Sequence, residues 1–267
     1  MKRVQLFEFE DFTWFPKWIR SCMTNLLIVV HKMMGTKEVL VNILSEIRKR
    51  HSFSQVVDLG SGSGGIMPNV ITHLNEENPD DSVHLLLTDL HPNNEIIALI
   101  NTSEESHIKY RTTPLDATHF KNIPEGLKTM INSFHHMPPQ KAKMILQSAQ
   151  ENKEAILIYE MAENKIPLLL WWLLLPISLA IVFVMALILT PFSKPITLKQ
   201  LVFTYLIPII PIFYAWDGQA SLPRMYTFKD IDGLLKDIKN DEYVWEMAQG
   251  KKVNGKPLGY YVLGLPK

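Results

Sequence analysis

The stretch VVDLGSGSGG, residues 56–65, decides how the rest of this chain is interpreted. A short apolar run ends in Asp58, and glycines follow at positions 60, 62, 64 and 65. Glycines directly after a buried strand indicate a turn in which the backbone comes close to a ligand. Where a helix begins after such a turn, its free N–H groups also point at the ligand. The stretch therefore predicts a ligand-binding loop between a strand and a helix.

Apolar runs alternate with helix-like segments on both sides of this loop. Strands are predicted at 55–60, 83–90, 108–118, 128–137 and 154–162, and a C-terminal hairpin is predicted to join 243–252 to 259–266. The continuous apolar character of the five runs is typical of parallel strands that helices cover on both faces. We therefore expect one α/β domain that ends in an antiparallel hairpin.

Acidic residues after the predicted strands indicate the kind of ligand that the loop holds. Asp89 ends the second strand, where it can accept hydrogen bonds from a ribose diol. Asp58 would repel a pyrophosphate but could pair with the ammonium group of an amino acid. Asp116 and Ala117 follow the third strand, where an adenine amine could sit. Together these positions favour a nucleoside that carries an amino acid.

The glycine spacing alone leaves a second ligand open. Gly60, Gly62 and Gly65 also satisfy the dinucleotide pattern G-x-G-x-x-G, with Asp89 at roughly the expected distance. The sequence has no Tyr-x-x-x-Lys pair of the kind that short-chain dehydrogenases use. NAD is therefore the less favoured ligand.

Four stretches, VVDLGSGSGG, LLLTDL, PLDAT and INSFHHMPP, follow one another in an order that resembles the class I S-adenosylmethionine-dependent methyltransferases. The resemblance covers roughly residues 39–159 and 226–267. It implies a Rossmann-like α/β fold with seven strands in the order 3-2-1-4-5-7-6, strand 7 being antiparallel. It also implies S-adenosylmethionine as the cofactor.

The same resemblance assigns cofactor-binding residues. Asp58 and the glycines would contact the methionine part, Asp89 the ribose, and Asp116 with Ala117 the adenine. The complete expected set is Asp58, Gly60, Ser61, Gly62, Gly64, Asp89, Leu90, Asp116, Ala117 and Ser133.

Two adjacent histidines, His135 and His136, are the candidate catalytic residues. Their stretch, NSFHHMPP, departs from the Asn-Pro-Pro-Tyr signature of exocyclic-amine methyltransferases and looks closer to the version in small-molecule and quinone methyltransferases. A histidine at the end of a strand can take a proton from a hydroxyl group that attacks the methyl group. Oxygen is then the natural accepting atom. The alternative is that both histidines only shape the loop over the cofactor.

Four further residues, Trp14, Glu160, Arg224 and Tyr226, are candidates for substrate binding. Glu160 ends the fifth strand, and Arg224 and Tyr226 bring the chain back toward the rim of the site. A solvated strand end and an ordinary ion-paired segment are the alternative interpretations. The aromatic stretch around Trp14 is typical of a membrane–water interface or of a cap on the core.

Composition argues against several other classes of protein. Lysine plus arginine equals aspartate plus glutamate, 27 each, so no net field attracts nucleic acid. Basic residues interleaved with aromatics are also absent from the sequence, which argues against a nucleic-acid partner. No His/Cys cluster has metal-ligand spacing, so we predict no metal site.

An uncharged stretch of 25 residues, 166–190, interrupts the α/β pattern. As a helix it would extend about 37 Å, enough for a hydrocarbon core of about 30 Å. The next apolar run, 201–216, is short and contains two prolines. Two crossings, a re-entrant or in-plane anchor and a buried hairpin or dimer interface are the alternatives. Prolines at 167, 176, 191, 208 and 211 would bend the segments, which favours a shallow or re-entrant hairpin.

We therefore divide the chain into an aromatic N-terminal cap or interfacial segment (1–35), a methyltransferase domain (36–165 and 217–267) and a membrane-embedded insert (166–216). The expected function is methyl transfer to a lipophilic or membrane-associated small molecule, with the catalytic domain on the cytoplasmic face of a membrane. The expected partners are this small molecule and the lipid bilayer. The alternatives are a non-catalytic membrane protein that binds a nucleotide and a membrane-bound NAD-dependent oxidoreductase.

Overall fold

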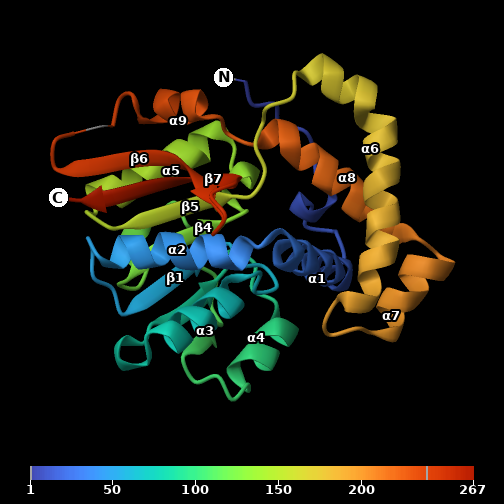
Figure 1. Cartoon of the computed structure of the whole chain (residues 1–267), viewed down its shortest axis with the longest axis horizontal. Helices are drawn as coiled ribbons and strands as arrows, with labels where there is room; N and C mark the ends of the chain where they lie inside the picture. Colours follow the sequence, from blue (N-terminus) through green and yellow to red (C-terminus); the bar gives the residue numbers. More distant parts are fainter. Residues whose placement is uncertain (1, 239) are drawn as a thin grey trace.

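A sheet of seven strands forms the centre of the computed structural model, which describes residues 2–238 and 240–267 (Figure 1). The strands are β1 (Gln55–Leu59), β2 (His84–Thr88), β3 (Ile108–Tyr110), β4 (Leu127–Ile131), β5 (Ile156–Glu160), β6 (Tyr243–Lys251) and β7 (Pro257–Pro266). Their order is β3-β2-β1-β4-β5-β7-β6, and β7 runs antiparallel to both of its neighbours. The predicted fold class and strand order are confirmed.

Helices lie on both faces of the sheet and beside it. They are α1 (Lys17–Met34), α2 (Thr36–Arg48), α3 (Met67–Glu77), α4 (Asn94–Asn101), α5 (Pro139–Glu151), α6 (Leu168–Leu189), α7 (Leu198–Leu201), α8 (Ile209–Arg224) and α9 (Phe228–Leu235). Short 3-10 turns are η1 (Phe9–Asp11), η2 (Pro79–Asp81), η3 (Phe120–Asn122), η4 (Phe134–His136) and η5 (Thr190–Phe192), and η6 (Val202–Leu206) is a π-helical turn.

Alternate residues of each central strand pack into two separate hydrophobic clusters. Val56 and Leu157 belong to the cluster that contains α2 and α3, whereas Val57 and Ile158 belong to the cluster that contains α5 and α9. Each fully buried side chain of this size contributes about 1.5–3 kcal/mol relative to its exposed state. Burial on both faces explains why these strands are continuously apolar in sequence.

The parallel strands bring their carboxyl ends to one edge of the sheet. Leu59 lies beside Thr88 of β2, and β4 and β5 continue the same direction on the other side of β1. The chain leaves β1 between β2 and β4, where the strand order reverses. In open α/β sheets this switch point is where ligands bind.

A third hydrophobic cluster joins the N-terminal segment to the insert. Leu26 of α1 packs there with Ala186 of α6 and Ile210 of α8. Figure 1 shows these three helices together beside the sheet, with α6 outermost. Helix α1 was not predicted, although its apolar residues recur at helical spacing. The segments 1–35 and 166–216 therefore share one core.

Helix α6 is the one helix among the described residues that is long and apolar enough by itself to cross a membrane. Only 22% of the most apolar 18-residue stretch of this helix is buried in the protein. The next segment forms a pair of helices, Leu198–Leu206 and Ile209–Arg224, bent by 81° at Pro208. The bend at Pro208 agrees with the prediction, but Pro176 lies inside an uninterrupted α6. The predicted boundary between 216 and 217 falls within α8.

Two predicted strands are shorter in the structure. β3 ends at Tyr110, because the chain turns away before Pro114, which has no N–H to donate to a sheet. β4 ends at Ile131, and Asn132 after it adopts a positive φ of 50°. Both histidines consequently lie on the turn η4 and not on the strand.

Gly259 provides a test of the pairing between β5 and β7. Its φ is +67°, and a Cβ atom there would overlap the carbonyl oxygen of Glu160 and lie 2.8 Å from Cα of Met161. We expect Gly259→Ala to lower the free energy of unfolding by more than about 1–3 kcal/mol, the usual cost of such backbone strain, because the clash adds to it. Chemical denaturation followed by circular dichroism measures this.

Gly233→Ala in α9 is the matched control, because a Cβ atom there meets nothing within 4 Å. It should raise the free energy of unfolding by about 0.5–1 kcal/mol. Equal effects of the two substitutions would contradict the described pairing.

Candidate functional site

The glycine-rich loop leaves β1 in a conformation that favours glycine. Gly60, Gly62, Gly64 and Gly65 have φ values of 73°, 53°, 98° and 55°. Left-handed backbone costs other residues about 1–2 kcal/mol each, which accounts for four glycines so close together. The backbone N–H of Gly62 donates to Oδ2 of Asp89 at 2.9 Å. The loop is therefore fastened to the carboxyl end of β2.

Asp58, near the end of β1, fixes the start of this loop. Its Oδ1 accepts a hydrogen bond from Thr129 and its Oδ2 accepts one from Ser61, each at 2.7 Å. The side chain is buried, and this burial raises the pKa of Asp58 to about 6 against the effect of the two hydrogen bonds. Asp58 is thus placed to shape the loop, and both of its oxygens already accept hydrogen bonds.

The other residues expected to bind the cofactor follow the ends of β2, β3 and β4. Oδ1 of Asp89 accepts from the N–H of His91 at 2.7 Å, and the carbonyl of Asp89 accepts from Leu115 at 2.9 Å. The latter bond ties the segment with Asp116 and Ala117 to the end of β2. Leu90 is exposed.

Ser133 lies on the opposite side of the loop. A Cβ atom on Gly60 would lie 3.5 Å from the Ser133 side chain, and the Ser133 hydroxyl donates to the carbonyl of Leu59. The structure therefore brings the predicted residues to the same edge of the sheet.

Helix α1 adds contacts to this edge that were not predicted. The hydroxyl groups of Ser21 and Ser63 lie 3.1 Å apart, so α1 meets the glycine-rich loop. One turn from the end of α1, Nε2 of His31 lies 2.9 Å from the amide nitrogen of Asn132. Burial lowers the pKa of His31 to about 4, so this imidazole is neutral at pH 7 and can accept a hydrogen bond from Asn132.

His135 and Glu160 form a buried pair at the carboxyl ends of β4 and β5. Glu160 accepts from the backbone N–H of His135 through Oε1 and lies 2.9 Å from Nδ1 of the same residue through Oε2. A carboxylate on Nδ1 keeps the hydrogen there, which leaves Nε2 as a lone-pair acceptor. Glu160, a candidate for substrate binding in the sequence, is 0% exposed and instead contacts the catalytic candidate His135.

His136 lies in a different electrostatic environment, although it is the next residue. Its ring nitrogens lie 3.2 Å from Glu8, 3.3 Å from Glu10 and 2.9 Å from Asp11. Burial lowers the pKa of His136, but these carboxylates outweigh burial and raise it to about 9. A protonated imidazole cannot accept a proton, so this environment argues against His136 as a base.

The residues around His136 come from an N-terminal strap, which we define as residues 2–15. Arg3 donates to the carbonyl of His135 at 2.7 Å, and the N–H of Val4 donates to the carbonyl of Pro223 at 2.8 Å. Farther along, the N–H groups of Phe9 and Glu10 donate to Asp217 of α8. The strap therefore lies across both η4 and the end of α8.

Arg224 closes the strap onto α8. Its Nη1 lies 3.1 Å from Oε1 of Glu8 and 2.6 Å from Oδ2 of Asp11, and its side chain is 0% exposed. The hydroxyl of Tyr226 donates to the carbonyl of Met137 at 2.6 Å. The alternative interpretation, an ion-paired segment, therefore describes Arg224 better than a substrate clamp does.

Trp14, the remaining candidate for substrate binding, lies at the surface. Its indole is 65% exposed and stacks on Phe12 with ring centroids 5.4 Å apart. It lies on the strap near α1, and it makes no described contact with His135 or Glu160.

Comparisons with known proteins add to this geometry. No family model matches the chain, and no curated protein matches it in sequence. Solved structures do resemble it. The plantazolicin methyltransferase BpumL in complex with SAH (S-adenosylhomocysteine) aligns over 93% of this chain and 86% of its own, with 10% identity and a TM-score of 0.51.

Two further structures are less similar. The methyltransferase domain of bacterial CtHen1-CN aligns over 85% of this chain and 98% of its own, with 9% identity and a TM-score of 0.48. The O-methyltransferase NcsB1 was solved in complex with SAM and 2-hydroxy-5-methyl naphthoic acid. It aligns over 81% of this chain and 50% of its own, with 11% identity and a TM-score of 0.44. At these identities a likeness establishes the fold alone. The chain has the fold of the class I methyltransferases.

The buried ion pairs of Arg224 can be tested through stability. We expect Arg224→Met to lower the free energy of unfolding by about 3–5 kcal/mol, because the buried Glu8 would lose its guanidinium partner. Chemical denaturation of the detergent-solubilised protein measures the loss. Arg50→Met is the control, since it breaks an exposed ion pair with Glu246 and should cost at most about 1 kcal/mol. Similar losses for the two variants would contradict the described burial.

Proposed function

We propose that this protein transfers a methyl group from S-adenosylmethionine to the oxygen of a lipophilic or membrane-associated small molecule. The observation that carries the proposal is the glycine-rich loop at the switch point of the sheet, tied to Asp89 through Gly62. The fold supports it, because BpumL, which resembles this chain along most of its length, was solved with SAH.

The cofactor would lie along the carboxyl ends of β1, β2 and β3. Its methionine part would approach Gly60 and Gly62, where glycines in left-handed backbone carry no side chain that would occupy the space of a ligand. Asp89 would accept hydrogen bonds from the ribose, and Asp116 with Ala117 would line the adenine. Asp58 is buried and would act through Ser61, whose hydroxyl group it holds. The proposed set also includes Gly64, Leu90 and Ser133.

Proton removal from the methyl acceptor would fall to His135. Its Nδ1 is held by Glu160, so Nε2 can accept the proton of a hydroxyl group as the oxygen attacks the methyl carbon. The sulfonium sulfur then leaves with the electrons of the broken S–CH₃ bond, which gives S-adenosylhomocysteine. Glu160 would orient the imidazole and balance the positive charge that forms on it. We do not assign a proton-accepting role to His136.

The membrane part of the proposal rests on α6 and on the strap. Helix α6 presents a long apolar surface, and Phe7, Phe12 and Trp14 of the strap are also exposed apolar side chains. Aromatic side chains of this kind favour the membrane–water interface. An anchor at this end of the sheet would set the site against a bilayer with the catalytic domain on the cytoplasmic face, so that an amphiphilic acceptor could enter from the lipid.

Binding of S-adenosylhomocysteine tests the cofactor assignment. We expect Asp89→Ala to weaken this binding about 10- to 100-fold, because hydrogen bonds to a charged group contribute about 1.5–3 kcal/mol. Isothermal titration of the detergent-solubilised protein measures it, with NAD titrated in parallel. Asp232→Ala, on α9 and outside the proposed set, should bind as the wild type does. Tighter binding of NAD than of S-adenosylhomocysteine would favour the oxidoreductase instead.

The role of His135 can be separated from cofactor binding. We expect His135→Gln to slow methyl incorporation from radiolabelled S-adenosylmethionine into a total lipid extract by about 10²- to 10⁴-fold, the usual contribution of general base catalysis. Its affinity for S-adenosylhomocysteine should stay within about twofold of the wild-type value, since the imidazole is not in the cofactor set. Unchanged incorporation by His135→Gln would contradict a proton-accepting role.

A charge on α6 tests the membrane anchor. Ile181 lies near the middle of α6 and is 62% exposed. Ile181→Arg should move protein from the membrane fraction to the soluble fraction, because an arginine at the centre of a span costs about 2.5–3.5 kcal/mol. Leu99→Arg on α4, which is also exposed, is the control and should leave the distribution unchanged. A soluble wild-type protein would remove the anchor from the proposal.

A further inference from the structure

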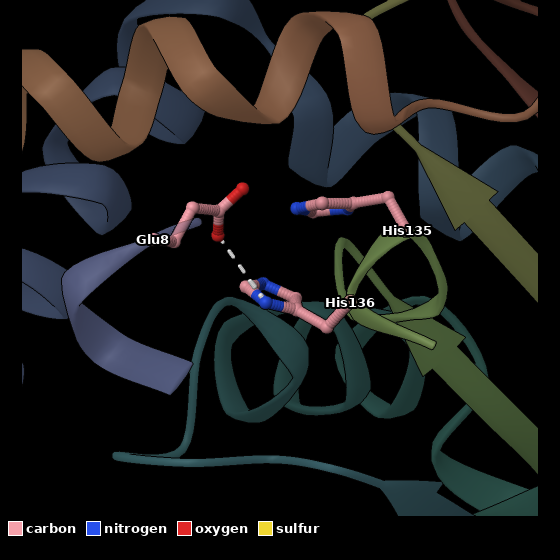
Figure 2. A group of neighbouring side chains, drawn as sticks. All are labelled: Glu8, His135 and His136. Atoms are coloured by element: carbon pink, nitrogen blue, oxygen red, sulfur yellow. Dashed lines mark ion pairs between the residues drawn. The ribbon is translucent and has the colours of Figure 1, made fainter. Parts of the chain in front are cut away.

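Three potential ligand atoms of a metal ion meet where the strap crosses η4. One carboxylate oxygen of Glu8 and one nitrogen each of His135 and His136 lie within 4.8 Å of one another. Figure 2 shows the Glu8 carboxylate facing both imidazoles. Glu8 and His135 are buried, and His136 is partly buried. No sequence pattern marks this cluster, because Glu8 lies more than 120 positions from the two histidines.

His135 is oriented as metal-binding histidines usually are. Its Nδ1 is held by Glu160 at 2.9 Å, which leaves Nε2 for a further ligand. Metal-ligating histidines almost always donate their other N–H to a carboxylate or carbonyl group, which fixes the ring and increases the basicity of the ligating nitrogen. The Glu160–His135 arrangement provides this support before any ion is bound.

Glu8 is oriented by a different partner. Arg224 lies 3.1 Å from Oε1 of Glu8, which turns Oε2 toward Nδ1 of His136 at 3.2 Å. Oε2 is buried and accepts no hydrogen bond within the described structure. Oε2 therefore has only the ion pair with His136, and a bound cation would give it a second partner.

The charges around the cluster also point to a cation. Glu8, Glu10 and Asp11 lie within 3.3 Å of His136, and Glu160 lies within 2.9 Å of His135. Two guanidinium groups accompany these four carboxylates: Arg224 contacts Glu8 and Asp11, and Arg3 contacts the carbonyl of His135. With His136 protonated the cluster therefore carries about one excess negative charge, and about two once a bound divalent ion displaces the His136 proton.

We propose that Glu8, His135 and His136 bind one divalent transition-metal ion of the Zn²⁺ class. Two imidazoles and one carboxylate form a nitrogen-rich donor set that suits zinc and its neighbours and does not suit magnesium or calcium. Three protein ligands leave at least one position of the ion open. The ion would fasten the N-terminal strap to η4, in addition to the ion pairs of Arg224.

This site does not depend on methyl transfer, but its occupancy changes the role of His135. A bound ion uses the Nε2 lone pair that would otherwise accept the proton. In the loaded protein the hydroxyl group of the acceptor would instead bind the open position of the ion and release its proton to water. Its oxygen would then form the bond to the methyl carbon while the S–CH₃ bond breaks.

Metal content measured by mass spectrometry tests the site directly. The full-length protein in detergent is stripped with a chelator, dialysed against ZnCl₂ and then against metal-free buffer. The wild type should retain one zinc ion per chain. Glu8→Gln and His136→Gln should retain less than a tenth of that amount. Glu160→Gln, which removes only the support of His135, should weaken Zn²⁺ binding about 10- to 100-fold.

A matched variant and a second titration keep the result interpretable. His84→Gln removes an exposed imidazole far from the cluster and should retain zinc as the wild type does. Titration with S-adenosylhomocysteine reports whether each variant is folded. Wild-type protein that binds S-adenosylhomocysteine but retains no zinc, or variants that retain as much zinc as the wild type, would overturn the metal site and leave the methyltransferase intact. Zinc retention without binding of S-adenosylhomocysteine would support the metal site and overturn the proposed function.

Discussion

The candidate site depends on how the chain turns as it leaves β1. The turn needs left-handed backbone at four glycines, and contacts from neighbouring strands and from α1 hold it in one shape. Asp58 holds Ser61 from the β1 side, and Asp89 holds the N–H of Gly62 from the β2 side. Asp89 reaches the loop only because parallel pairing brings the ends of β1 and β2 together. Without this pairing the loop would lose the contact between Gly62 and Asp89.

A second set of charged side chains lies where the N-terminal strap covers the carboxyl ends of β4 and β5. The strap carries Glu8, Glu10 and Asp11 into a region that also holds Arg224 and the two histidines. Moving charges out of water is expensive, and pairing offsets that cost only where the geometry is good. Apolar side chains at these positions would have packed the strap onto α8 without this cost. The presence of so many ionisable groups at the ends of β4 and β5 is therefore better explained by chemistry at this place than by stability.

The sequence was sufficient for the features that depend on neighbouring residues. Continuous apolar runs predicted β1, β2, β4 and β5, because each run lies within about ten residues. The strand order was implied by the resemblance of the four motifs to the class I methyltransferases. The positions that follow the strands, such as Asp89 and Asp116, could be assigned to one edge for the same reason. The predicted ends of β3 and β4 were less accurate. Both strands end early, β3 before Pro114 and β4 before Asn132 with its left-handed backbone.

The contacts between distant segments could not be predicted. The strap meets α8 through residues more than 200 positions apart, as with Glu8 and Arg224, and no local pattern marks such a pair. His135 and His136 are adjacent and similar in sequence, yet one faces Glu160 and the other faces three carboxylates of the strap and η1. Helix α1 could have been predicted from its apolar spacing, but its contact with the glycine-rich loop, 42 positions away, could not.

The crystal structure of the protein in complex with S-adenosylhomocysteine would test the central claim most directly. We predict that the homocysteine part lies over Gly60 and Gly62, that the ribose hydroxyls lie within hydrogen-bond distance of Asp89, and that the adenine lies beside Ala117. The sulfur should face His135. A ligand bound elsewhere on the protein, or an empty loop in crystals grown with saturating S-adenosylhomocysteine, would contradict the account.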